Sequence, residues 1–256
     1  MIARRLRIAT RLITVAALLI CCLLLHALWR SVHRRSPWPR RFLGASARVA
    51  GARVRRQGEI APAPLLLIAN HVSWIDILAL AEATGTRFVG HDGLAAHPVL
   101  RRLCQINGTV FVARQDRAGV GGQAARIAEA LSADSGRGGV LTLFPEGTTG
   151  DGRALLPFKS ALLAALESAP PTVSVQPVLL DYGAEAAAIA WTGDEPGLAN
   201  VLRILARARP LAVTLRFLPP LTPEKRVSRK AMAAAARDSI WGALADATTN
   251  ENAVSG

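Results

Sequence analysis

A histidine and an aspartate lie five residues apart at the end of an apolar run, and together they could act as a general base. His71 follows the run of residues 65–69, and Asp76 lies where the chain turns apolar again. A histidine with its ordinary pKa near ~6.5 accepts a proton at neutral pH, and a carboxylate on its other ring nitrogen would stabilise the imidazolium. We therefore treat His71 and Asp76 as candidate catalytic residues.

Asp76 also has a purely structural explanation. Ser73-x-x-Asp76 resembles a capping box with Ser73 as the N-cap, and an acidic residue in the first turn of a helix is favoured by the helix dipole. Because His71 precedes this expected helix, its ring could fold back over the first turn and reach Asp76. Both roles of Asp76 stay open on spacing alone.

Arg114 ends a second apolar run, residues 108–113. A guanidinium group binds a phosphate or a carboxylate through two parallel hydrogen bonds, so Arg114 is a candidate substrate-binding residue. The alternative is a surface arginine that pairs with Asp116.

Glu146, Gly147 and Thr148 follow a third apolar run, residues 139–144. Glycine allows the backbone to approach a ligand closely, so this segment could place a carboxylate and exposed N–H groups beside a substrate. An ordinary surface turn has the same composition.

A sheet with parallel strands would bring these residues together, because ligands bind beyond the carboxyl ends of the strands in open α/β sheets. We therefore predict an α/β fold with a mixed, mostly parallel central sheet flanked by helices. Pro177 favours an edge strand or an irregular turn within its own run, and we expect residues 248–256 to be disordered. The expected strands are 65–69, 86–90, 108–114, 139–144, 172–181 and 211–218, with helices after Ser73 and at 119–135, 157–168 and 228–245.

The N-terminal segment is basic around an apolar centre. Residues 12–29 contain no charged side chain, and a helix of this length either just crosses the hydrocarbon of a bilayer or dips into one leaflet. A secretory signal peptide is the rival interpretation, but no cleavage pattern of small residues follows. We predict a membrane-anchoring helical segment at residues 1–60 and a second domain at residues 61–256. Arginines after the apolar centre place that domain on the cytoplasmic side of the inner membrane.

The charge distribution and the cysteine positions argue against several classes of protein function. The net charge is +13, and residues 1–60 carry +12 of it through thirteen arginines and one glutamate. A nearly neutral main domain argues against a nucleic-acid partner. The three cysteines show neither a disulfide framework nor metal-ligand spacing, and no Gly-x-Ser-x-Gly motif of a hydrolase is present. Residues 40–57 are compatible with two structures, a basic helix that lies on anionic headgroups or a solvated linker helix.

Taken together, these segments resemble the glycerolipid acyltransferase family, the lysophosphatidic acid acyltransferases and their relatives. The resemblance covers roughly residues 60–222 and is carried by four segments. They are Asn70-His71-x-x-x-x-Asp76, Gly108-x-x-Phe111-x-x-Arg114, Phe144-Pro-Glu-Gly-Thr148 and Gln176-Pro-Val178.

The resemblance implies a role for each candidate residue. His71 is similar to the general base that deprotonates the acceptor hydroxyl, and Asp76 to the carboxylate that orients it. Arg114 is similar to the residue that binds the acceptor phosphate, whereas Glu146, Gly147 and Thr148 are similar to residues that position the acceptor. An acyl-CoA or acyl carrier protein thioester is the implied co-substrate, with no cofactor and no metal, and membrane lipids are the implied partners.

Two positions differ from many makers of phosphatidic acid. His91 replaces a lysine, and Thr149 replaces an arginine after the Glu-Gly-Thr motif. Residues 144–152 also resemble the lyso-ornithine lipid acyltransferases, whose acceptor has no phosphate. We expect 1-acyl-glycerol-3-phosphate as the acceptor because Arg114 and Lys159 remain. Lyso-ornithine lipid, or a catalytically silent lipid-binding homologue, is the alternative.

Overall fold

The structure is a computed structural model, and it describes residues 1–33, 36–91, 98–112, 126–127, 129–131, 139–167, 169–193 and 195–255. Its strands are β1 (Ala52–Gln57), β2 (Leu65–Ala69), β3 (Arg87–His91), β4 (Val110–Val112), β5 (Val140–Leu143), β6 (Ser174–Asp181) and β7 (Leu211–Phe217). Its α-helices are α1 (Ile2–Val32), α2 (Trp38–Ala50), α3 (Ile75–Thr84), α4 (Pro98–Asn107), α6 (Ala186–Ile189), α7 (Gly197–Leu205) and α8 (Arg229–Ser255). Three 3₁₀ helices are η3 (Ser160–Leu166), η4 (Gly183–Glu185) and η5 (Pro223–Arg226).

Within the described residues, seven strands form one sheet in the order β1-β7-β6-β2-β5-β3-β4. Every neighbouring pair is parallel except β6 and β7, which are antiparallel. The predicted α/β fold with a mixed, mostly parallel sheet is therefore confirmed.

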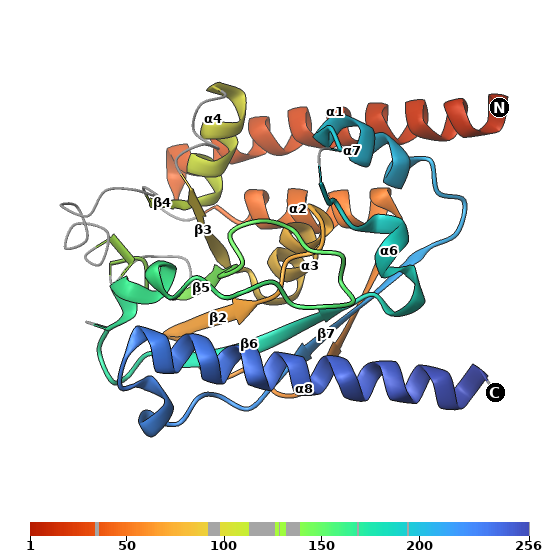
Figure 1. Ribbon diagram of the computed structural model, residues 1–256. Coiled ribbons are helices and arrows are strands. Elements are labelled where there is room, and N and C mark those ends of the chain that lie inside the picture. Colours follow the sequence, from red (N-terminus) through yellow and green to blue (C-terminus); the bar gives the residue numbers. More distant parts are fainter. Residues whose placement is uncertain are drawn as a thin grey trace.

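Strand β2 lies inside this sheet and is covered on both faces, which explains its continuous apolar sequence. Leu65 and Leu67 pack with side chains of α2 and α3, whereas Leu66 and Ile68 pack with side chains of η3 and α8. Figure 1 shows these two layers, with α2 and α3 on one side of the sheet and α8 on the other. The carboxyl end of β2 is thus held from both sides.

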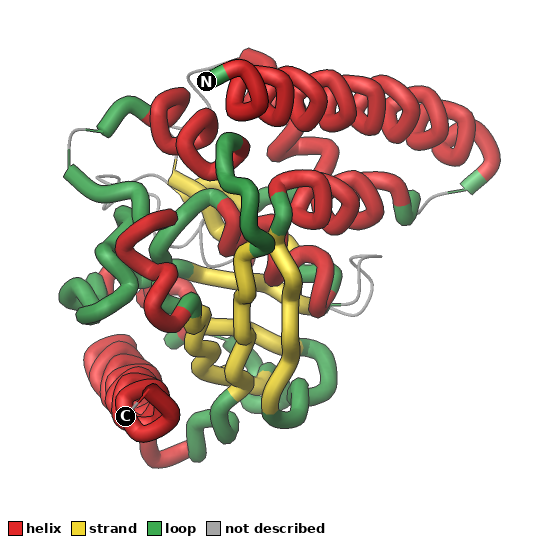
Figure 2. The backbone as a smooth tube through the Cα atoms, turned by 90° about the vertical axis from the view of Figure 1, so that its right-hand side faces the viewer, coloured by secondary structure: helices red, strands yellow, loops and turns green. Residues whose placement is uncertain are grey.

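Helix α1 lies on the same side as α2 and far from α8 (Figures 1 and 2). It packs along α2 and reaches α7, where Arg7 donates to the Ala206 carbonyl and Arg11 donates to the Leu205 and Arg207 carbonyls. Cations at the C-terminal end of a helix are favoured by its dipole. These contacts hold α1 against the folded domain.

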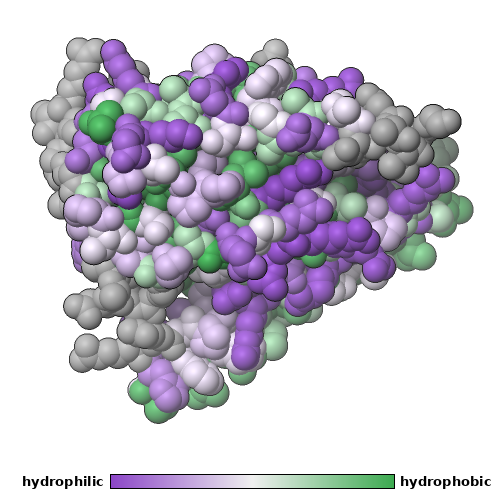
Figure 3. Space-filling model, turned by 90° about the horizontal axis from the view of Figure 1, so that it is seen from below, coloured by the Kyte–Doolittle hydropathy of each residue, from purple (hydrophilic) through white to green (hydrophobic). Residues whose placement is uncertain are grey.

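Exposed apolar side chains concentrate on α1. It is the helix in the described part of the chain that is long and apolar enough to cross a membrane, and none of its residues is buried. By contrast, hydrophilic side chains gather over the face seen from the side of α8 (Figure 3). The apolar surface therefore lies on the α1 side of the molecule. Its large exposed members are Met1, Ile2, Leu6, Leu12, Ile13, Ile20, Leu23, Leu24, Leu28, Trp29 and Val32.

Several expectations about individual elements are wrong. Residues 52–57 form β1 instead of continuing a basic helix, so the sheet begins before residue 60. Residues 160–166 form a 3₁₀ helix, and α8 extends to Ser255 where we expected disorder from residue 248.

Pro177 lies in an interior strand, contrary to the expected edge position, because β6 pairs with both β2 and β7. Pairing with β7 begins only at Val178, and the Pro177 carbonyl accepts the Leu218 N–H just beyond the end of β7. The nitrogen of Pro177, which carries no hydrogen, faces the β7 side of the strand like the carbonyl. No hydrogen bond to β2 is therefore lost.

Candidate active site

Asn70 extends the pairing of β2 and β6 through its side chain. Its amide nitrogen donates to the Leu180 carbonyl at 3.1 Å, and its amide oxygen accepts the Leu180 N–H at 2.7 Å. The side chain is 2% exposed and thus satisfies two buried backbone groups. This contact fixes the point at which the chain leaves the sheet and enters the His71 turn.

The ring of His71 lies against the carboxylate of Asp76, as we predicted. His71 Nδ1 is 2.7 Å from Asp76 Oδ2, and the Asp76 side chain is fully buried. The ring also stacks on Phe144, with 4.1 Å between the two ring centroids. With Nδ1 bound to the carboxylate, Nε2 is the nitrogen available to accept a proton.

The expected N-cap at Ser73 is wrong, although half of the capping box is present. Asp76 Oδ2 accepts the N–H groups of Val72 at 2.6 Å and Ser73 at 2.9 Å. Trp74, however, is the N-cap, and the buried hydroxyl of Ser73 has no partner among the described residues. The segment 72–74 therefore wraps around the Asp76 carboxylate, which serves both as a helix-start acceptor and as the partner of His71.

Glu146 holds the main chain of His71 in place. Its Oε1 accepts the His71 N–H at 2.8 Å and its Oε2 accepts the Leu156 N–H at 2.9 Å, while the Gly150 N–H donates to the His71 carbonyl at 2.7 Å. The side chain is 2% exposed, and burial raises its pKa to about 7. Both oxygens of Glu146 are therefore bound to main-chain N–H groups, one of which belongs to His71.

A cavity of about 1020 Å³ opens beside His71. Gly147, Thr148 and Lys159 line it together with His71, whereas Glu146 does not. The rest of the wall is mostly apolar and includes side chains of α1 and α2. These are Leu19, Cys22, Leu23, His26, Trp38, Pro39, Phe42 and Leu43.

Among the described residues that line this cavity, Lys159 is the only lysine or arginine. Gly147 leaves room for its side chain. A Cβ atom on Gly147 would lie 3.0 Å from Lys159 Nζ, and the positive φ of 69° at this residue also favours glycine. Arg114, the other predicted cation, lies outside the described residues.

Tyr182 is not among the residues expected from the sequence, and its hydroxyl donates to Asp76 Oδ1. Tyr182 directly follows β6, so its place at the carboxyl end of a strand is the signal that could have identified it. The segment after α6 was not expected at the site either, and there the Thr149 hydroxyl donates to the Trp191 carbonyl and the Trp191 N–H donates to the Val72 carbonyl. Thr149, which we noted in place of the arginine of many makers of phosphatidic acid, thus ties the Glu-Gly-Thr turn to Trp191, which lines the cavity.

Comparisons with known proteins identify the family of the chain. A family model described as Acyltransferase matches residues 51–181. The chain is 31% identical to the lyso-ornithine lipid O-acyltransferase of Rhizobium meliloti, with 88% of this chain and 81% of the relative covered. It is also 31% identical to the enzyme of the same name from Rhodobacter capsulatus, with 93% and 90% covered.

Two further relatives carry the name of the other candidate acceptor. The 1-acyl-sn-glycerol-3-phosphate acyltransferase of Neisseria gonorrhoeae is 29% identical, with 77% of this chain and 75% of the relative covered. The crystal structure of the 1-acyl-sn-glycerophosphate acyltransferase PlsC from Thermotoga maritima has the same fold, with a TM-score of 0.58 and 18% identity over 92% of this chain and 97% of that one. The matched family model, the relatives and the fold agree, and the chain belongs to the glycerolipid acyltransferases of the lysophosphatidic acid acyltransferase type.

Proposed function

We propose that this acyltransferase moves a fatty acyl group from a thioester, acyl-CoA or an acyl carrier protein, to the free hydroxyl of a lyso-lipid. The observation that carries the proposal is the His71 ring, which contacts the buried Asp76 carboxylate through Nδ1 and lines the cavity. A neutral imidazole placed in this way is suited to general-base catalysis.

In the proposed reaction, His71 Nε2 accepts the hydroxyl proton while the hydroxyl oxygen bonds to the thioester carbonyl carbon. The C–S bond then breaks, and the proton leaves with the thiolate as a free thiol. The negative charge of Asp76 stabilises the imidazolium between these two steps. No acyl-enzyme is needed, because acceptor and donor meet directly beside the ring.

The cavity supports an acyl chain as its occupant. Its volume and mostly apolar wall suit a fatty chain, and it extends from His71 to the apolar side chains of α1 and α2. Because exposed apolar side chains concentrate on α1, we place this side of the molecule in the membrane. The arginines that follow residues 12–29 favour the cytoplasmic side for the folded domain.

For the acceptor we propose lyso-ornithine lipid. Four of the relatives carry this name, with identities of 31 to 34%, whereas the Neisseria relatives named for the glycerol phosphate acceptor are 29% identical. Thr149 agrees with this choice, because it holds the Trp191 carbonyl where an arginine would add a cation for a phosphate. The residues alone had favoured 1-acyl-glycerol-3-phosphate, which we keep as the second candidate because Lys159 lines the cavity.

Arg114, Gly147 and Thr148 are proposed to bind the acceptor. For Glu146 we propose an indirect role, since its two oxygens already accept backbone N–H groups and the residue does not line the cavity.

The test supplies the purified protein in detergent with one acyl thioester and either lyso-ornithine lipid or lysophosphatidic acid, and measures the acylated lipid by mass spectrometry. We expect product with the wild type and none with His71→Ala, while both proteins bind the lyso-lipid. The faster acceptor identifies the substrate. A His71→Ala variant as active as the wild type would exclude a general-base role, and a wild type that binds lipid without product formation would indicate a silent homologue.

A further inference from the structure

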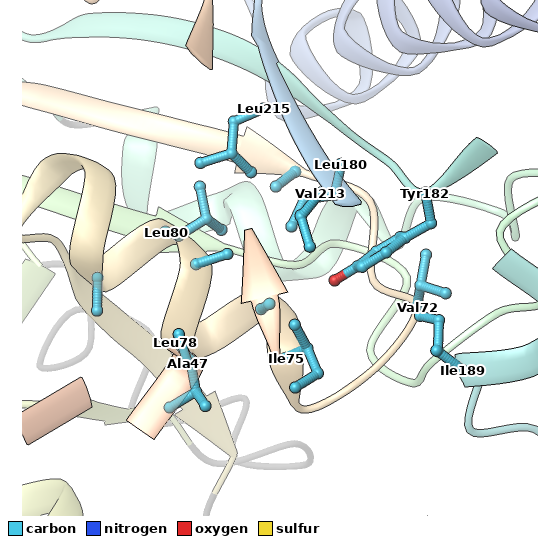
Figure 4. Packing of buried hydrophobic residues seen from close by; sticks show 14 of the residues in the cluster. Ala47, Val72, Ile75, Leu78, Leu80, Leu180, Tyr182, Ile189, Val213 and Leu215 are labelled. Atoms are coloured by element: carbon cyan, nitrogen blue, oxygen red, sulfur yellow. The ribbon is translucent and has the colours of Figure 1, made fainter. Parts of the chain in front are cut away.

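Tyr182 contacts the carboxylate of Asp76 from a part of the chain that is distant in sequence. Its hydroxyl donates to Oδ1, the oxygen that does not face His71. The two residues are 106 positions apart and meet because β6 lies next to β2 in the sheet. Figure 4 shows the Tyr182 ring beside Val72 and Ile189, with its hydroxyl directed toward the start of α3, where Ile75 lies.

The position of Tyr182 is itself fixed by the candidate active-site turn. The Asn70 side chain binds both backbone groups of Leu180, two residues before the tyrosine. On the other side of the strand end, Asp181 accepts hydrogen bonds from Arg216 of β7 at 2.7 and 3.1 Å. The phenol therefore approaches Asp76 from a rigid strand end rather than from a free loop.

The two oxygens of Asp76 have different partners. Oδ2 is shared by His71 Nδ1 and the N–H groups of Val72 and Ser73. Oδ1 is bound by Tyr182, and the carboxylate is fully buried, so no solvent can replace the phenol. Rotation about χ2 of an aspartate is broad and roughly two-fold. The donor on Oδ1 therefore adds a contact on the second oxygen, which helps the donors on Oδ2 to keep the carboxylate plane aligned with the His71 ring.

We infer that Tyr182 is a positioning residue for catalysis, which holds the Asp76 carboxylate charged and aligned so that His71 can act as the base. The inference rests on the proposed function. Burial and the charge of Asp76 raise the pKa of Tyr182 well above its ordinary value, so the hydroxyl stays a hydrogen-bond donor across the working range of pH.

The experiment measures kcat and both KM values for Tyr182→Phe in the wild-type background and in an Asp76→Asn background. Phenylalanine keeps the ring and its packing and removes only the hydroxyl. A hydrogen bond to a charged group corresponds to a factor of roughly ten in rate. We expect kcat to fall by about this factor, with both KM values unchanged, when Asp76 is present. In the Asp76→Asn background we expect no further loss, because the charge through which Tyr182 acts is absent.

A matched control separates positioning from packing. Ile189→Val removes one methyl group from the cluster that surrounds the tyrosine and leaves its hydroxyl in place. Both variants are expected to lower the melting temperature, Ile189→Val through lost packing and Tyr182→Phe because Oδ1 of the buried carboxylate loses its donor. Only Tyr182→Phe is expected to lower kcat, whereas Ile189→Val should change kcat by less than about twofold. A Tyr182→Phe loss of the same size in both backgrounds, or no loss at all, would overturn the inference.

A second readout does not depend on acyl transfer. The NMR signal of the proton between His71 Nδ1 and Asp76 Oδ2 should differ in chemical shift between Tyr182→Phe and the wild type, because a misaligned carboxylate changes this hydrogen bond. An unchanged signal would contradict the positioning role. A wild type that forms no product would refute the proposed function alone, and the NMR signal would still decide the role of Tyr182.

Discussion

The carboxylate of Glu146 accepts the main-chain N–H of His71 at 2.8 Å, so the glutamate of the Phe-Pro-Glu-Gly-Thr segment holds the histidine of a different strand end. The two residues are 75 positions apart and meet because β5 pairs with β2. The two most specific motifs of the sequence are therefore parts of one hydrogen-bonded unit.

The first prediction concerns the pH dependence of stability that follows from Glu146. Because its pKa is raised to about 7 in the folded protein, the folded state binds this proton more tightly than the unfolded chain does. Its contribution to the free energy of unfolding is full below the ordinary carboxyl pKa and is lost as the pH rises through about 7. Stability should fall between about pH 4.5 and 7 and level off above this range, and Glu146→Gln should weaken this dependence.

Below about pH 4.5, Glu146→Gln should also lower the free energy of unfolding by roughly 1–3 kcal/mol, because an amide offers one acceptor oxygen to two N–H groups, and this difference should shrink as the pH rises through about 7. Denaturant unfolding in detergent at several pH values measures both effects. Glu59→Gln is the control, since the Glu59 side chain is exposed. An unchanged pH dependence in Glu146→Gln would show that another group dominates the titration.

The second prediction concerns the charge of Asp76. Asp76→Asn retains an oxygen acceptor for the Val72 and Ser73 N–H groups but removes the charge that stabilises the His71 imidazolium. We expect kcat to fall by roughly 100- to 10,000-fold, with a much smaller change in the acceptor KM.

Initial rates at saturating donor and acceptor measure this loss. The control is Asp151→Asn, in which an exposed residue accepts the Arg153 and Ala154 N–H groups in a turn. It should stay within about twofold of the wild type. Comparable rates for Asp76→Asn and Asp151→Asn would mean that Asp76 has only the structural role at the start of α3.

The residues that could be predicted from the sequence are those determined by local pattern. The apolar run of β2 identified a buried strand, and the five-residue spacing allowed His71 to meet Asp76. Ser73 was misassigned as the N-cap because the capping-box pattern does not reveal that Asp76 binds backbone N–H groups and the histidine at once.

Contacts that depend on strand order could not be predicted in this way. Tyr182 reaches Asp76 only because β6 lies beside β2, and Pro177 is tolerated in the interior only because pairing with β7 begins one residue later. The same reason applies to Glu146, whose sequence neighbours suggest an exposed turn although its side chain is buried under His71.

The third prediction concerns Lys159 and the acceptor. Its ammonium group lies beside Gly147 on the cavity wall, where it can bind the carboxylate of an ornithine headgroup or a phosphate. Lys159→Met keeps an unbranched side chain, one atom shorter, and removes the charge. In this variant we expect the acceptor KM to rise by about tenfold, with the donor KM unchanged. For Lys159→Arg we expect an acceptor KM between those of the wild type and Lys159→Met.

Steady-state rates with each substrate varied in turn separate these constants. Arg153→Met is the matched control, because Arg153 is exposed in the same segment and does not line the cavity. A rise in the donor KM instead would assign Lys159 to the thioester.

The fourth prediction concerns the acyl chain and α1. Leu23 lines the cavity and is 37% exposed, whereas its neighbour Leu24 is 68% exposed and does not line it. A larger side chain at position 23 should shorten the space available to a fatty chain. Leu23→Trp is therefore expected to shift the preference toward shorter acyl donors, while Leu24→Trp, which adds the same ring on the outer surface, should leave the preference of the wild type unchanged. Competition among thioesters of different chain length, analysed by mass spectrometry of the product, measures the shift, and equal preferences in the two variants would place the acyl chain outside this cavity.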